Sequence, residues 1–114
     1  DIGVVPWSPL AGGFLTGKYS RGEKPPEGTR GATDQQFRDS YLTDENFDAL
    51  EAVEAVAEEV GASPAQVSLA WLTDHEQVTA PIVGARTVEQ LHENLAATEI
   101  DLTAEQFQRL AEAK

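Results

Sequence analysis

Two patterns of apolar residues alternate along the chain. Residues 2–6 and 78–83 are short apolar runs rich in β-branched residues, each ended by turn-forming residues, which is typical of strands buried on both faces. Elsewhere the apolar residues recur every three or four positions, as on one face of a helix. This spacing predicts four helices. The first begins at Thr43 or Asp44 and ends at Gly61, and the second covers 64–73.

Polar residues mark where the other helices begin. Ser63, Thr87 and Thr103 are each followed three positions later by Gln, the spacing of a capping box. The residues expected to face inward are Leu50, Val53, Ala57 and Val60 on the first helix, Val67, Ala70 and Trp71 on the second, Val88, Leu91 and Leu95 on the third, and Phe107, Leu110 and Ala111 on the last.

The order of these elements favours an α/β fold with a parallel sheet. Residues 16–42, rich in Gly, Pro and charged side chains, are expected to form one long functional or disordered loop between the first strand and the first helix. Two parallel strands cannot cover their own faces, so the chain is expected to be an incomplete part of a larger domain. The absence of any Met points the same way.

Composition narrows the range of functions. The net charge of −12 argues against a nucleic-acid partner, and no apolar stretch is long enough to span a membrane. The chain has no Cys, and His75 and His92 lie far apart without other ligands nearby, so no metal site is expected. A cytoplasmic location fits these features. Residues 18–38 nevertheless hold five basic and three acidic side chains. A basic loop on an acidic body is compatible with an anion site, but composition alone favours a solvated loop with incidental charges.

The two predicted strand ends carry suitable chemistry for a nucleotide. After the first strand, Trp7 offers a flat face for a planar ring, and the small residues from Ser8 to Gly13 would let backbone N–H groups approach an anion. After the second strand, Gly84 and Arg86 lead directly into a helix whose N-terminus suits a phosphate group.

Four blocks of sequence, in this order and spacing, resemble the C-terminal third of aldo-keto reductases. They are WSPLAGGFLTGKY at 7–19, PEGTR at 26–30, SPAQVSLAWL at 63–72 and PIVGARTVEQLHENLAA at 81–97. The resemblance runs over nearly all 114 residues. It implies the C-terminal portion of a (β/α)8 TIM barrel, with strand seven at 2–6 and strand eight at 78–83, making residues 1–114 a partial, cofactor-binding domain.

The resemblance also assigns roles toward NADP(H). Trp7 would stack on the nicotinamide, and Lys18 and Arg30 would clamp the phosphates as their loop folds over the cofactor like a belt. Gly84 and Arg86 would hold the 2′-phosphate. The pyrophosphate would be lined by Ser8, Pro9, Leu10 and Ala11, and the adenosine would be surrounded by Gln90, Glu93 and Asn94.

The implied function is the NADP-binding part of an oxidoreductase that reduces aldehydes or ketones by hydride transfer. The family's proton-donating Tyr and its partners have no counterpart here, and neither Tyr19 nor Tyr41 has the expected neighbours. We therefore expect no catalytic residue within 1–114 and an inactive chain when it stands alone. The alternatives are a non-catalytic NADP-binding interaction subunit of the same fold, like the family's channel-associated members, and a truncated, inactive product.

Overall fold

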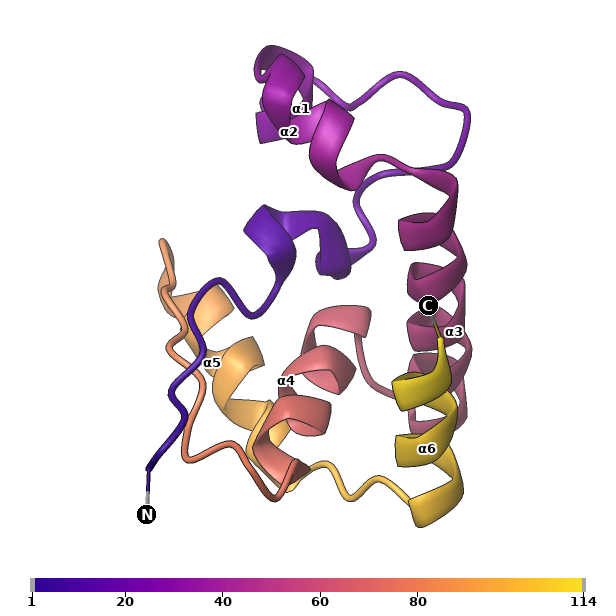
Figure 1. The fold of residues 1–114 in the computed structure, drawn as a ribbon. Coiled ribbons are helices and arrows are strands. Elements are labelled where there is room, and N and C mark those ends of the chain that lie inside the picture. Colours follow the sequence, from indigo (N-terminus) through magenta and orange to yellow (C-terminus); the bar gives the residue numbers. More distant parts are fainter. Residues whose placement is uncertain (1, 114) are drawn as a thin grey trace.

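The computed structural model describes residues 2–113, and helices are the regular elements of that range (Figure 1). Helix α4 lies at the centre of the molecule, where α3, α5, η1 and η2 pack against it, while α6 packs mainly on α3. In chain order the elements are η1 (Ala11–Thr16), α1 (Arg30–Thr33), α2 (Gln35–Tyr41), α3 (Asp44–Val60), α4 (Pro64–Asp74), α5 (Val88–Ala96), η2 (Ala97–Glu99) and α6 (Ala104–Glu112).

The prediction of two strands, and with it of an α/β barrel portion, is wrong: residues 2–113 contain no strand. Residues 2–6 and 78–83 are extended and lie side by side (Figure 1). Two backbone hydrogen bonds join them, from Thr79 N to Val4 O and from Ile82 N to Pro6 O, each at 2.8 Å. From the first bond to the second, the acceptor and the donor both move to a higher residue number, so the two segments run parallel. Pro6 and Pro81 have no N–H to donate, which leaves this pair too sparsely bonded to form a ladder.

The predictions for the two central helices are confirmed. Thr43 caps α3 by accepting from Asn46 N at 3.3 Å, and Gly61 ends the helix with a φ of 70°. Ser63 opens α4 with a full capping box, in which Ser63 Oγ accepts from Gln66 N and Gln66 Oε1 accepts from Ser63 N. The two helices pack around a core in which Val56 of α3 and Val67 of α4 are completely buried.

The third predicted helix forms as α5, but its apolar face is not buried. Val88 is 69% exposed, Leu95 57% and Leu91 47%. The extended segment beside it also carries exposed apolar side chains, among them Ile82 at 57%. The expected inward face of α5 is therefore wrong for this chain, because no described element covers it.

The last helix, α6, forms as predicted and packs on α3 and α4. Thr103 and Gln106 make the second full capping box. Phe107 stacks on Trp71 of α4 with ring centroids 5.3 Å apart, and Trp71 Nε1 donates to Phe107 O. Trp71 is thus a packing residue, as its place on the helix predicts.

The predicted long loop at 16–42 contains two short helices, α1 and α2, and has its own aromatic core. We call residues 17–42 the strap. Its Tyr19 and Phe37 are both buried, at 3% and 2% exposure, and pack with Phe14 and Phe47 from η1 and α3. The sequence did not indicate this aromatic core, because the aromatic residues of the strap are separated by glycines and prolines and follow no regular spacing. The strap is therefore an ordered unit above the N-terminal half of α3 (Figure 1).

None of the helices in the described range is both long and apolar enough to cross a bilayer.

A polar clasp between α3 and α6 gives the fold a pH dependence. Glu59 Oε2 accepts from Arg109 Nη2 at 2.6 Å and from Gln106 Nε2 at 3.1 Å. The hydrogen bond from Arg109, and then that from Gln106, lowers the pKa of Glu59. A lowered pKa in the folded state means that the clasp is fully formed above the ordinary pKa of Glu, about 4.3, and is lost as the pH falls through the lowered value.

We predict that Glu59→Gln lowers stability at pH 7 and flattens its pH dependence between about pH 5 and 3. The substitution removes the charge that Arg109 binds. Urea denaturation across this pH range measures the effect. Glu58→Gln is the matched control, because Glu58 is exposed and pairs with none of residues 2–113. Identical pH profiles for the two variants would contradict the prediction.

Candidate functional site

A turn of two glycines follows the first extended segment and forms the centre of the site. Gly12 and Gly13 have φ values of 66° and 99°, which glycine adopts at low cost. They lie in η1, where Gly13 N donates to Leu10 O at 3.0 Å. Ala11 N and Gly13 N are thus used within the turn, and the two glycines leave a stretch of backbone that carries no side chains.

Two cationic side chains from the strap lie against this turn. A Cβ atom built on Gly13 would be 3.2 Å from Nζ of Lys18, and one built on Gly12 would be 3.2 Å from Nη1 of Arg30. Both glycines therefore allow a close approach of positive charge to the backbone. The structure brings together Lys18 and Arg30, which are 12 residues apart in the sequence, at two adjacent residues.

Two residues before the glycines have unfavourable backbone geometry. Ser8 and Ala11 have φ values of 50° and 53°, and they are the non-glycine residues of the described chain with positive φ. Such conformations cost on the order of 1–2 kcal/mol each and tend to be retained at functional sites. Both belong to the predicted pyrophosphate lining. Leu10 lies between them, half-buried, and accepts from Gly13 N and Leu15 N.

Pro9, another predicted lining residue, faces a different cavity. It lines an apolar cleft of about 230 Å³ with side chains of η1, α3, α4 and α6, including Leu15, Val53 and Trp71. Pro9 thus packs toward the helices rather than beside the two cations.

Arg30 is oriented by an aromatic ring and a carboxylate. Its guanidinium lies over the Phe37 ring at 5.4 Å, and its Nε is 3.4 Å from Oδ2 of Asp34. The Asp34 carboxylate caps α2, and the hydrogen bond that it accepts from Phe37 N is the main cause of its lowered pKa. Arg30 remains 61% exposed, so it retains donors for a ligand.

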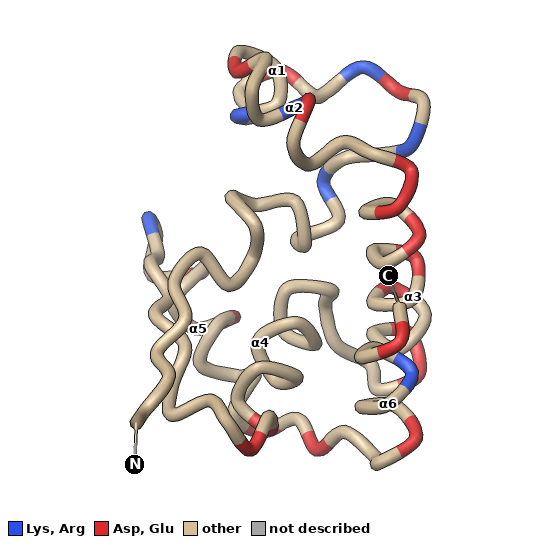
Figure 2. Tube along the Cα trace, viewed as in Figure 1, with Lys and Arg blue, Asp and Glu red and all other residues tan. Residues whose placement is uncertain are grey.

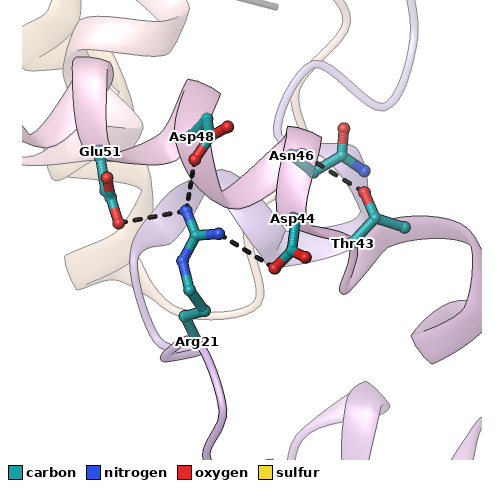
Figure 3. Close-up of polar contacts among 6 residues, drawn as sticks. All are labelled: Arg21, Thr43, Asp44, Asn46, Asp48 and Glu51. Atoms are coloured by element: carbon teal, nitrogen blue, oxygen red, sulfur yellow. Dashed lines mark hydrogen bonds and ion pairs between the residues drawn. The ribbon is translucent and has the colours of Figure 1, made fainter.

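Arg21 fixes the strap to the acidic face of α3 (Figure 3). Its guanidinium donates to Asp44 at 3.0 Å, Asp48 at 2.6 Å and Glu51 at 3.2 Å, and lies 5.6 Å from the centre of the Phe47 ring. The hydrogen bond to Asp48, and then that to Glu51, raises the pKa of Arg21. Figure 2 shows acidic residues along α3 and basic residues in the strap above it. Arg21 is thus occupied, which leaves Lys18 and Arg30 as the cations at the turn.

The second predicted group of residues lies at the start of α5. Thr87 Oγ1 accepts from Gln90 N at 3.1 Å, while Gln90 Oε1 accepts from Arg86 N at 2.8 Å. The predicted capping box is therefore half formed, because Gln90 bonds one residue earlier than expected. Arg86 is exposed and forms no ion pair with residues 2–113. Gly84 is exposed too, with nothing within 4 Å of a Cβ built on it.

Glu93 and Asn94 complete this second group. Glu93 is exposed, and its backbone carbonyl accepts from Gln66 Nε2 of α4 at 3.0 Å. Asn94 is half-buried on the next position. Across the described chain, no hydrogen bond or ion pair connects this group with the glycine turn or the strap.

Comparison with known proteins identifies the chain's relatives. A sequence model of the Aldo/keto reductase family matches residues 1–114. The chain belongs to the aldo/keto reductase family.

Three relatives illustrate the similarity. The chain is 42% identical over 104 residues to an uncharacterized oxidoreductase, YrpG, of Bacillus subtilis (strain 168), covering 91% of this chain and 29% of that protein. It is 39% identical to the L-glyceraldehyde 3-phosphate reductase of Escherichia coli O157:H7, covering 84% and 28%. It is also 39% identical to a putative voltage-gated potassium channel subunit beta of Schizosaccharomyces pombe, covering 96% and 33%. The chain thus spans about a third or less of the length of these relatives.

In this aldo/keto reductase chain the predicted site residues fall into two groups. Ser8, Leu10, Ala11, Lys18 and Arg30 gather at the glycine turn, and the residues from Gly84 to Asn94 gather at α5. The two extended segments run parallel, and Pro6 O accepts from Ile82 N near their C-terminal ends. These two ends therefore lie on the same side of the molecule, and one leads to the glycine turn while the other leads to α5. Trp7, which follows Pro6, is 79% exposed, so its indole face is free of packing.

The sequence already indicated Gly12 and Gly13 as part of a stretch that an anion could approach, and the two cations lie against these glycines. It did not indicate the contact between Tyr19 and Gly31, which holds the strap together. No local signal marks that pair, because the two residues meet only through the folding of the strap.

We predict that Arg21→Ala loosens the strap without unfolding the helices. The loss of three ion pairs exposes the segment between Gly22 and Thr29, so a glutamate-specific protease should cleave after Glu23 or Glu27 several-fold faster. High salt should speed cleavage of the wild type toward the variant's rate, because exposed pairs are screened. Arg109→Ala, which removes ion pairs outside the strap, is the control. Equal cleavage rates in both variants would show that Arg21 does not hold the strap.

Proposed function

We propose that residues 1–114 form the NADP(H)-binding segment of an oxidoreductase that reduces aldehydes or ketones. The bound nicotinamide would supply the hydride, and this chain would bind and orient the cofactor. The proposal extends the family membership of the chain to an activity of the whole protein. It takes the nicotinamide dinucleotide and a small carbonyl compound as the protein's ligands.

The observation that carries the proposal is the placing of Lys18 and Arg30 on adjacent glycines. A pyrophosphate needs positive charge and backbone donors within a few ångströms of each other, and bulky side chains would keep it from the backbone. The Gly12–Gly13 turn and the strained Ala11 beside it supply the close approach, and the two cations supply the charge. The chemistry of these donors fits a dinucleotide phosphate.

The remaining contacts in the proposal follow from exposure and charge. Trp7 offers an uncovered indole on which the nicotinamide ring would stack. At α5, Arg86 would bind the 2′-phosphate together with the N–H groups of Val88 and Glu89, which have no acceptor among residues 2–113. Gln90 and Asn94 would contact the adenosine.

The chain itself supplies no proton donor in this proposal. Tyr19 is buried in the aromatic cluster with its hydroxyl bonded to Gly31 N, and Tyr41 packs on Phe37. The buried Tyr19 hydroxyl cannot meet a carbonyl oxygen, and the proposal gives Tyr41 no such role. Residues 1–114 alone are therefore expected to bind nucleotide without reducing carbonyl compounds.

The direct test uses the protein that carries this sequence, at its full encoded length. Titration with NADPH, followed by the quenching of tryptophan fluorescence, measures binding. Oxidation of NADPH in the presence of a nitrobenzaldehyde, followed by absorbance, measures turnover. A protein that binds no NADPH would end the proposal.

We predict that Lys18→Gln weakens NADPH binding about tenfold or more, because a charge-assisted hydrogen bond contributes roughly 1.5–3 kcal/mol. The loss should be largest at low salt, where the interaction is least screened. Lys24→Gln is the matched control, since Lys24 is exposed in the same strap and neither glycine of the turn has it as a close neighbour. If both variants lose affinity equally, overall charge rather than the glycine turn determines binding.

We predict that Arg86→Ala reduces the preference for NADPH over NADH. Only the 2′-phosphate distinguishes the two cofactors, and Arg86 is the side chain at the start of α5 that would contact it. The kcat/KM ratio for the two cofactors measures the preference, and Arg109→Ala serves as the charge-matched control. An unchanged ratio would remove Arg86 from the site.

A second candidate function is a nucleotide-binding subunit without turnover. It is favoured by the 39% identity to a protein named as a putative voltage-gated potassium channel subunit beta. The two candidates separate in the assays above: NADPH binding with no carbonyl reduction over a broad set of aldehydes and ketones favours this second function.

A further inference from the structure

Tyr19 is a buried tyrosine in a place where phenylalanine would fill the same space. Its ring is 3% exposed, stacks with Phe14 at 6.4 Å between centroids and lies 5.5 Å from Phe37. Burying a hydroxyl is costly unless it is hydrogen-bonded. The hydroxyl of Tyr19 therefore needs a specific partner.

That partner is the start of α1. The Tyr19 hydroxyl oxygen accepts from Gly31 N at 2.9 Å. Thr29, the N-cap residue of α1, makes no side-chain cap and instead donates its hydroxyl to Pro26 O. Tyr19 thus satisfies one of the helix's first N–H groups in place of the usual capping side chain.

Gly31 makes this contact possible. A Cβ atom built on Gly31 would lie 2.5 Å from Cε1 of Tyr19, well inside van der Waals contact. Gly31 is itself buried. Ring and backbone therefore meet at a distance that only glycine permits.

The two ends of this contact are the neighbours of the two cations. Tyr19 follows Lys18 and Gly31 follows Arg30, while Lys18 and Arg30 lie against the adjacent residues Gly13 and Gly12. The Tyr19–Gly31 bond thus connects two separate stretches of the strap directly behind the cations. Breaking it would let the Lys18 and Arg30 backbones move apart.

We propose that the Tyr19 hydroxyl is a positioning group that sets the spacing of Lys18 and Arg30 for a diphosphate-bearing ligand. This inference rests on the proposed function of the glycine turn. Tyr19 touches no ligand in it and acts through the two cations.

Tyr19→Phe tests the proposal, because it removes the hydroxyl and keeps the ring. In the full-length protein we expect the KM for NADPH to rise about three- to tenfold, the effect of one lost hydrogen bond, while kcat stays within twofold. Tyr41→Phe is the matched control. Tyr41 packs on Phe37 in the same cluster, but its hydroxyl makes no hydrogen bond within residues 2–113.

A double-mutant cycle distinguishes positioning from stability. If Tyr19 acts through Lys18, Tyr19→Phe should add little to the loss already caused by Lys18→Gln. Thermal melts check that each variant remains folded. Full additivity of the two losses, or a Tyr19→Phe KM equal to that of Tyr41→Phe, would overturn the inference while leaving the proposed function intact. Failure of the wild type to bind NADPH would overturn both.

Discussion

The organisation of the site depends on the packing of four aromatic rings between the strap and the helices. Phe14 comes from η1, Tyr19 and Phe37 from the strap, and Phe47 from α3. Aromatic side chains bury large areas, and edge-to-face and offset pairs add to that burial. A segment rich in Gly, Pro and charge has few other apolar groups to bury. Without this cluster the strap would have little to hold it against the turn.

The basic residues of the strap have different roles. Arg21 binds three carboxylates of α3, so its charge is compensated and its role is to hold the strap in place. Lys18 and Arg30 lie against the glycine turn, and the Phe37 ring also contacts Gly12. The net positive charge of residues 18–38 is therefore a poor guide to the site, because Arg21 is paired with carboxylates whereas Lys18 and Arg30 lie at the turn. Their separation explains how an acidic chain can present two cations side by side at one turn.

The exposed apolar residues form the other main feature. Trp7, Val88 and Leu95 are more than half exposed, as is Ile82 in the extended pair beside α5. Apolar patterning predicts burial for Val88, Leu95 and Ile82, yet burial needs a second surface to pack against. The two extended segments hold one another by two backbone hydrogen bonds and do not become strands, because Pro6 and Pro81 have no N–H to donate. The prediction failed where it depended on neighbours that residues 2–113 do not supply.

The sequence by itself determined the features that depend on nearby residues. The capping residues Ser63 and Thr103, the terminating Gly61 and the spacing of apolar side chains on α3 and α4 all act within one or two helical turns, and each prediction is confirmed. The motifs also indicated the family correctly. Only the tertiary structure decided which distant residues meet: Lys18 and Arg30 at the glycine turn, Tyr19 at Gly31, and Arg21 at α3. Such contacts depend on how the strap folds back, and no local spacing encodes that path.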